Sequence, residues 1–184
     1  MRETAAQRPA EDYPQAMGSG VDELDARIIS VFTERPSIGV LGASRTLGVA
    51  RGTVQARLER LQERGVIRSM APTISPAACG YPVTAFCSLA IRQTRGQAPL
   101  VAHLAQIPEV IEAHTITGEF DLLVIAVARS NEDLQRVIDR VVEHEHVERA
   151  SSQIVLSTHI ERRTLPLVVA AAADDGDTEA DHAV

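Results

Sequence analysis

The apolar residues of the chain change their spacing once, at a proline-rich stretch, and this change constrains the fold more than any other feature. Residues 21–68 repeat apolar side chains at helical spacing, whereas residues 82–160 alternate strand-like and helical segments. Between them the stretch MAPTISPAACGYP, residues 70–82, holds three prolines and one glycine, which is typical of a linker. The sequence therefore predicts two domains of different architecture.

The predicted domains are flanked by segments without periodicity. The boundaries are a flexible tail at 1–20, a first domain at 21–69, the linker at 70–82, a second domain at 83–162 and an acidic tail at 163–184 that we expect to be disordered. The chain has no apolar run long enough to cross a membrane, and its first residues lack the apolar core of a secretory signal. We therefore expect a cytoplasmic protein that does not contact membranes.

The first domain reads as three short helices. The predicted helices span 21–34, 38–47 and 50–64. Asp22 and Ser37 are the expected N-caps, and Gly48 and Gly65 are the expected ends of the second and third helices. The segment 66–74 then reads as an extended strand or a small hairpin. Helices joined by a tight glycine turn and followed by a strand indicate a winged helix-turn-helix.

The charge distribution points to the partner of this first domain. The whole chain has a net charge of −7, yet residues 42–71 hold six arginines against two glutamates. In the third helix Val54, Leu58 and Leu61 fall on one stripe, which leaves small, polar and arginine side chains outside. Arginine contacts phosphate or guanine, and Gln and Thr contact base edges. A solvated surface helix is the alternative, but the preceding short helix, the glycine turn and the positive block favour double-stranded DNA.

The second domain alternates strands and helices in a recognisable order. Strands are predicted at 83–92, 110–117, 120–128 and 147–157, with helices at 97–107 and 131–145. This β-α-β-β-α-β order is the ferredoxin-like unit, whose helices cover one face of the sheet. The whole chain is thus predicted to be an α+β protein. The uncovered face needs a partner, most simply a second copy of the chain.

Catalytic and metal-binding patterns are not found in the sequence. It has no Gly-Lys-Ser/Thr phosphate loop and no G-x-S-x-G elbow. His144 and His146 form the one cluster resembling a metal site, but residues two apart point to different sides of a helix. Cys79 and Cys87 cannot hold a metal alone. We therefore expect no enzymatic activity, no metal and no cofactor.

Three segments together resemble one known family. RPSIGVLGASRTLGVARGTVQARLERLQERGVI and VDELDARIISVF are similar to the DNA-binding half of the Lrp/AsnC (leucine-responsive, or feast/famine) regulators, and TGEFDLLV, residues 117–124, resembles the turn of their amino-acid-sensing domain. The resemblance covers roughly residues 22–160. It implies a winged helix-turn-helix joined to a ferredoxin-like sensing domain, homodimers that can assemble into tetramers or octamers, promoter DNA as partner, and an amino acid as effector.

The resemblance also implies which residues contact DNA. The matching recognition-helix positions are Arg51, Gly52, Thr53, Gln55, Arg57 and Arg60. Arg51, Thr53 and Gln55 lie near the helix start and are expected to contact bases. Arg57 and Arg60 are expected to contact phosphates, although Arg57, beside the apolar stripe, can instead form a structural ion pair. Ala50 stands where the family usually has a serine cap, which predicts a looser helix start.

The implied effector site lies at the turn. Its residues are Thr117, Gly118, Glu119 and Asp121, with Ser152 on the last strand. The two carboxylates suit an ammonium group, and backbone amides exposed by the glycine suit a carboxylate. The alternative is a plain type I′ or II′ hairpin turn with two surface acids. Without a ligand, the protein would instead be a DNA-bridging architectural protein.

Overall fold

The computed structural model describes residues 20–92 and 97–181, and these form two separate compact units. The helical unit contains the described residues up to Pro72 together with those from Arg162 on, and the sheet unit contains Thr73–Glu161. Most of the expected flexible tail, residues 1–19, lies outside the described residues. None of the described helices is both long and apolar enough to cross a membrane.

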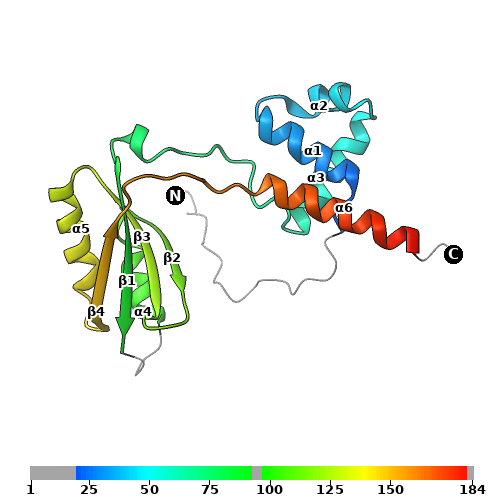
Figure 1. The fold of residues 1–184 in the computed structure, drawn as a ribbon. Helices are drawn as coiled ribbons and strands as arrows, with labels where there is room; N and C mark the ends of the chain where they lie inside the picture. Colours follow the sequence, from blue (N-terminus) through cyan, green and yellow to red (C-terminus); the bar gives the residue numbers. More distant parts are fainter. Residues whose placement is uncertain (1–19, 93–96, 182–184) are drawn as a thin grey trace. The chain divides into compact units, whose positions relative to one another are not determined.

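The helical unit begins with the three predicted helices (Figure 1). They are α1 (Glu23–Glu34), α2 (Gly39–Leu47) and α3 (Arg51–Glu63). Asp22 caps α1 as predicted, because its Oδ1 accepts a hydrogen bond from the Asp25 amide at 2.9 Å. The prediction that Ser37 caps α2 was wrong, since Ile38 occupies the N-cap position and makes no side-chain capping bond.

Two glycines end the second and third helices as the sequence predicts. Gly48 follows α2 with φ of 70° and Gly65 lies just beyond α3 with φ of 73°, in the left-handed region that glycine adopts without strain. The stripe of Val54, Leu58 and Leu61 is buried, and Val54 and Leu58 pack with Ile28 of α1. The apolar side of α3 therefore holds the helix against α1 and α2, and its other side faces outward.

The predicted wing does not form a hairpin. Residues 66–74 contain no strand, and their first turn is closed by a bond from the Ile67 amide to the Leu61 carbonyl of 3.0 Å. Ile67 also packs against the helical core. A hairpin needs a second strand, and prolines at positions 72 and 76 interrupt the stretch that would supply one. Residues 66–74 therefore form an irregular segment with bends and without a strand.

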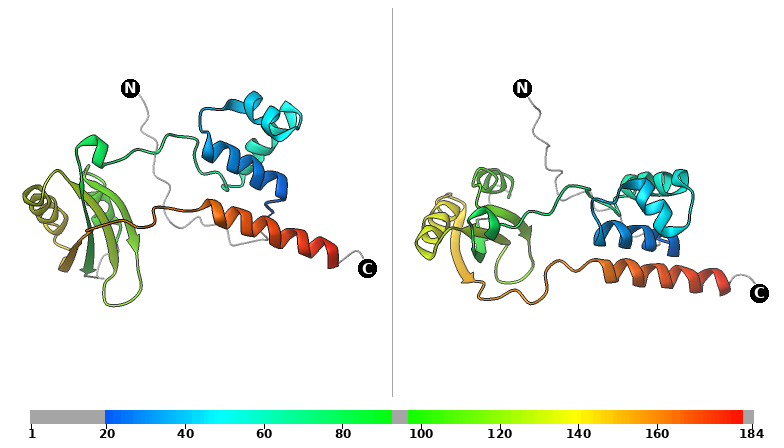
Figure 2. Two further views of the ribbon diagram at one scale, coloured as in Figure 1. Left: turned by 45° about the horizontal axis from the view of Figure 1, so that its top comes forward. Right: turned by 90° about the horizontal axis from the view of Figure 1, so that it is seen from above.

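The C-terminal segment differs from the expected disordered tail. Helix α6 (Leu165–Asp181) belongs to the helical unit and lies alongside α1, as both views of Figure 2 show. Its first half, LPLVVAAAA, is rich in alanine, and Leu165, Val168 and Ala171 are half-buried at helical spacing. Helix propensity and this apolar stripe explain why the segment folds despite its acidic end. Residues 182–184 lie outside the described residues.

The sheet unit has the predicted β-α-β-β-α-β order. Its elements are β1 (Val83–Ile91), α4 (Ala98–Leu104), β2 (Val110–Thr115), β3 (Leu122–Ala128), α5 (Asn131–Val142) and β4 (Val147–Ile154), preceded by the 3₁₀ turn η1 (Ala77–Cys79). The strands form an antiparallel sheet in the order β2-β3-β1-β4.

Both helices of this unit cover the same face of the sheet (Figure 2). Along β1, Ala85, Cys87 and Leu89 are buried in the core that these helices complete. Phe86 points to the opposite face and keeps 37% of its surface exposed. This alternation leaves one sheet face without a covering layer among the described residues, as the sequence predicts.

Candidate nucleic-acid interface and effector loop

The first turn of α3 presents small and polar side chains to solvent. Arg51, Gly52, Thr53 and Gln55 are all exposed. The N-cap residue Ala50 makes no side-chain capping bond, as predicted, so the positive end of the helix is left to a ligand. Among the described residues Arg51 has no ion-pair partner. This turn therefore combines an exposed positive charge with little side-chain bulk at the positive end of the helix.

Gln55 is oriented by its own helix. Its Nε2 donates a hydrogen bond of 2.7 Å to Oε1 of Glu59, one turn further along α3. Both side chains are exposed. The pairing leaves the Gln55 carbonyl oxygen available as an acceptor for a base-edge amino group.

Arg57 and Arg60, the two predicted phosphate ligands, form ion pairs with α1. Arg57 donates to Oδ1 of Asp25 at 2.9 Å and to the Asp22 carboxylate, and Arg60 donates to Oδ2 of Asp25 at 2.8 Å. Arg60 also lies 3.9 Å from Asp22. The structural ion pair considered for Arg57 is thus what the structure shows. Binding of either arginine to phosphate stays a prediction.

These ion pairs include one carboxylate, that of Asp25, which is fully buried. The Asp25 side chain is 0% exposed, and a carboxylate in that position is tolerated only when paired. Partial burial alone would raise the pKa of Asp22, but the hydrogen bonds from Arg57 and the Asp25 amide outweigh it and hold that pKa below its usual value. The hydrogen bonds that Arg57 donates to the carboxylates of Asp22 and, second, of Asp25 raise the pKa of Arg57.

The ion pairs border a shallow hollow on α3. Thr53, Ala56, Arg57 and Arg60 line it, and its volume is about 190 Å³. Asp22 was predicted only as a helix cap, and no role in the site was predicted for Asp25. The sequence did contain a signal for this cluster. Asp22 and Asp25 are three residues apart, and so are Arg57 and Arg60.

In the sheet unit the predicted turn is a longer loop. β2 ends at Thr115 and β3 begins at Leu122, so the plain two-residue hairpin considered as an alternative was wrong. The Ile116 amide bonds to the Asp121 carbonyl at 2.9 Å and closes the loop. Gly118 has φ of 118°, which L-residues with side chains rarely adopt. The loop 116–121, which is exposed at residues 117–119, is therefore shaped by its glycine.

Asp121 is tied to the neighbouring strand. Its Oδ2 accepts a hydrogen bond of 2.8 Å from the Ile91 amide, and its own amide donates to the Leu89 carbonyl at 2.9 Å. Glu119 differs, because it is exposed and pairs with Arg149 of β4 at 2.8 Å. Arg149 also lies over the ring of Phe120, 4.8 Å from its centroid. Glu119 is thus the loop carboxylate that a ligand can reach.

Ser152 is not brought to this loop. It pairs in register with Cys87 of β1, which in turn pairs with Val124 of β3, three residues beyond Asp121 at the end of the loop. Its hydroxyl donates to the Cys87 sulfur at 3.4 Å. Burial raises the pKa of the Cys87 thiol. The structure therefore brings together Thr117, Gly118, Glu119 and Asp121, and it leaves Ser152 two strands away.

The histidine cluster also differs from its sequence interpretation. α5 ends at Val142, so His144 and His146 do not lie on a helix, and their ring centroids are 4.8 Å apart. His103 of α4 lies 5.2 Å from His144 by the same measure. Within residues 20–92 and 97–181, no group of three or more His, Cys, Asp or Glu side chains is arranged to hold a metal ion.

Both units match known protein families. Residues 21–68 match the family described as winged helix-turn-helix DNA-binding, and residues 84–165 match the Lrp/AsnC ligand binding domain. The transcriptional regulator FL11 of Pyrococcus horikoshii is 30% identical over 121 residues, which are 66% of this chain and 80% of FL11. The regulator AldR of Mycolicibacterium smegmatis is 31% identical over 120 residues, 64% of this chain and 70% of AldR.

Solved structures agree with these sequence matches. AsnC of E. coli superposes with a TM-score of 0.72 at 25% identity, covering 79% of this chain and 99% of AsnC. A transcriptional regulator from Neisseria meningitidis, solved in complex with L-Met, superposes with a TM-score of 0.71 at 26% identity, covering 79% and 96%. The helix-turn-helix of the first unit, the sensing-type fold of the second and these matches lead to one conclusion: the chain belongs to the Lrp/AsnC family of DNA-binding transcriptional regulators.

Proposed function

We propose that this regulator reads its operator with the first turn of α3. Arg51, Thr53 and Gln55 supply the base contacts, and Gly52 allows close approach to the groove floor. The observation that carries this assignment is the exposed first turn, where Arg51 has no partner in the described part of the chain. The net positive charge of residues 42–71 draws the helix to DNA.

We further propose that an amino acid modulates this binding through the loop 116–121. Glu119 accepts the ammonium group, and amides around Gly118 donate to the carboxylate. Asp121 keeps the loop attached to β1 through its bond to Ile91. The regulator from Neisseria meningitidis, solved in complex with L-Met, supports an amino acid as the class of effector. Ser152 is left out, because it lies away from the loop.

We also propose that the chain acts as a homodimer formed through the uncovered sheet face. Phe86 on β1 lies between Ile125 of β3 and Gln153 of β4 on that face. A second copy covers the same residues on both partners, as closed twofold symmetry requires. Two recognition helices then meet the two halves of a palindromic operator.

Anisotropy titrations test these proposals directly. The full chain is titrated against promoter DNA of its own gene and against scrambled DNA, with and without the twenty amino acids. Tighter binding to the promoter that changes with the amino acids is expected. Specific binding indifferent to the amino acids contradicts the effector assignment, and equal binding to both DNAs favours a DNA-bridging protein instead. No binding at low salt contradicts the function assigned to α3.

A further inference from the structure

The positive charge that α3 offers to DNA is smaller than its sequence suggests. Residues 42–71 carry four surplus positive charges, and Arg57 and Arg60 supply two of them. Both guanidinium groups bond to carboxylates of α1. Asp22, Asp25, Arg57 and Arg60 therefore form a cluster with no net charge. The two arginines of this cluster lie on the same helix as the proposed base-reading residues.

The cluster is built around a carboxylate that solvent does not reach. Asp25 is 0% exposed, and its two oxygens each accept a bond from one arginine, at 2.9 and 2.8 Å. The Arg57 side chain is 26% exposed and the Arg60 side chain 45% exposed. Asp22 adds a second carboxylate that is 49% exposed. Each arginine is thus drawn inward by a full negative charge.

We propose that Asp22 and Asp25 keep Arg57 and Arg60 from the DNA backbone and so limit the sequence-independent part of the affinity. Phosphate contacts strengthen binding to every DNA and carry no base information, whereas the first turn of α3 faces the bases. Withholding two arginines therefore sharpens discrimination between operator and other DNA. The inference rests on the proposed role of α3 in binding DNA.

A supporting role for the same carboxylates makes the opposite prediction. If Asp25 held the arginines in place for phosphates beside the hollow lined by Thr53, its loss would weaken binding to all DNA. In the withholding role, loss of the charge releases the arginines and strengthens binding to scrambled DNA. The sign of one change therefore decides between the two roles.

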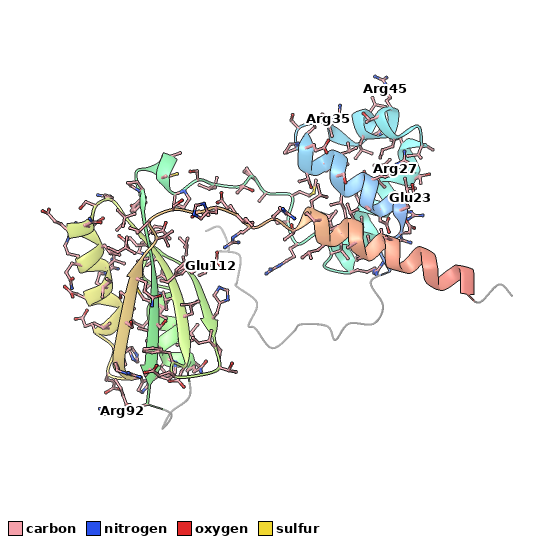
Figure 3. All side chains as sticks on the ribbon, viewed as in Figure 1. Glu23, Arg27, Arg35, Arg45, Arg92 and Glu112 are labelled. Carbon is pink, nitrogen blue, oxygen red and sulfur yellow. The ribbon has the colours of Figure 1, made fainter. Side chains whose placement is uncertain are left out.

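The experiment measures the affinity of the full chain for scrambled DNA across a salt series. The variants are Asp25→Asn and Asp22→Asn; asparagine caps helices as well as aspartate, so the second variant retains the cap of α1. The matched control is Glu23→Gln, which removes an acidic charge from α1 where the side chain is exposed (Figure 3) and forms no ion pair with α3. Circular dichroism confirms that each variant is folded.

The expected result is that the affinity for scrambled DNA depends more steeply on salt concentration. For each arginine released, the slope of log K against log salt steepens by about 0.9, with higher affinity for scrambled DNA at low salt. In Asp22→Asn the single charge of Asp25 faces two arginines, so the slope is expected to steepen by at most about 0.9 even if Asp25→Asn does not fold. Glu23→Gln is expected to leave the slope as in the unmodified chain. Adding Arg57→Gln to Asp22→Asn restores the original slope.

Two results separate failure of this inference from failure of the function. Unmodified protein that binds DNA, with variants that bind less tightly or with an unchanged slope, overturns the withholding role alone. An equal rise for Glu23→Gln also overturns it, because overall charge then explains the gain. Unmodified protein that binds no DNA at low salt overturns the assignment of α3 and this inference with it.

Discussion

Gly52 is a residue whose conformation does not require glycine. Its φ is not positive, and a Cβ placed on it meets no atom within 4 Å. Inside a helix, glycine costs stability relative to alanine because it loses more backbone entropy on folding. A position that is open in the free protein and still lacks a side chain fits a surface that another molecule approaches closely.

Replacing Gly52 by alanine is therefore expected to increase the stability of the fold and to weaken DNA binding. Gly52→Ala raises the free energy of unfolding by up to about 1 kcal/mol. The same methyl group meets the groove floor and weakens operator binding. Thermal melting and anisotropy on one preparation check both effects. A variant that is more stable and binds normally shows that no close approach occurs there.

Arg51 is expected to carry specificity. Arg51→Ala loses about 1–3 kcal/mol of discrimination between operator and scrambled DNA, the usual contribution of an arginine–base contact. Sedimentation of the variant is expected to match that of the unmodified chain. Arg136→Ala on α5 of the sheet unit is the charge-matched control, since this arginine pairs with Asp133 and is not on α3. Equal losses for both variants exclude a base contact by Arg51.

At the scale of elements, Asp22 at the start of α1 makes the stability of the helical unit depend on pH. The pKa of Asp22 is lower in the folded protein than its ordinary value of 3.8, so its ionised form favours folding. This contribution is fully present above the unfolded pKa and is lost as the pH falls through the folded one. Asp22→Asn is therefore expected to lower the melting temperature at about pH 6, with a difference that shrinks below about pH 4. A difference that stays constant down to strong acid contradicts the ion pair.

The two carboxylates of the loop between β2 and β3, Glu119 and Asp121, are expected to have different roles. Glu119→Gln is expected to abolish the response to the amino acid while changing the unfolding free energy by less than about 1 kcal/mol, because its ion pair is exposed. Asp121→Ala leaves the Ile91 amide without its acceptor. In addition to abolishing the response, it is expected to lower the free energy of unfolding by about 1–3 kcal/mol. Melting curves and amino-acid titrations distinguish the two. A normal response in Glu119→Gln removes that residue from the site.

Local signals in the sequence predicted most elements, whereas the partners of individual side chains in other elements were not predicted. Gly48 and Gly65 ended helices because a positive φ is a local preference, and Ala85, Cys87 and Leu89 alternated with a period of two. The bond between Asp25 and Arg57 joins residues 32 positions apart, and no local preference reveals it. Ser152 was assigned to the effector site by resemblance, and strand register sets it beside Cys87; its role in effector binding stays a prediction.

At the scale of the whole molecule, the uncovered sheet face is expected to determine the assembly. Phe86→Glu places a charge on that face and is expected to convert dimers to monomers in sedimentation velocity, with weaker operator binding because two half-sites are no longer read together. Val101→Glu, on α4 and 43% exposed, is the control with an equal change of charge. If Phe86→Glu sediments as the unmodified chain does, another surface joins the copies.

Helix α6 has a consequence for how the protein is made. The helical unit combines the segment before Pro72 with the segment after Arg162, and the sheet unit is encoded between them. During synthesis α1, α2 and α3 therefore leave the ribosome well before the helix that lies along α1. The DNA-binding unit is completed only after the sensing unit has been translated, so a nascent chain gains its full DNA-binding structure late.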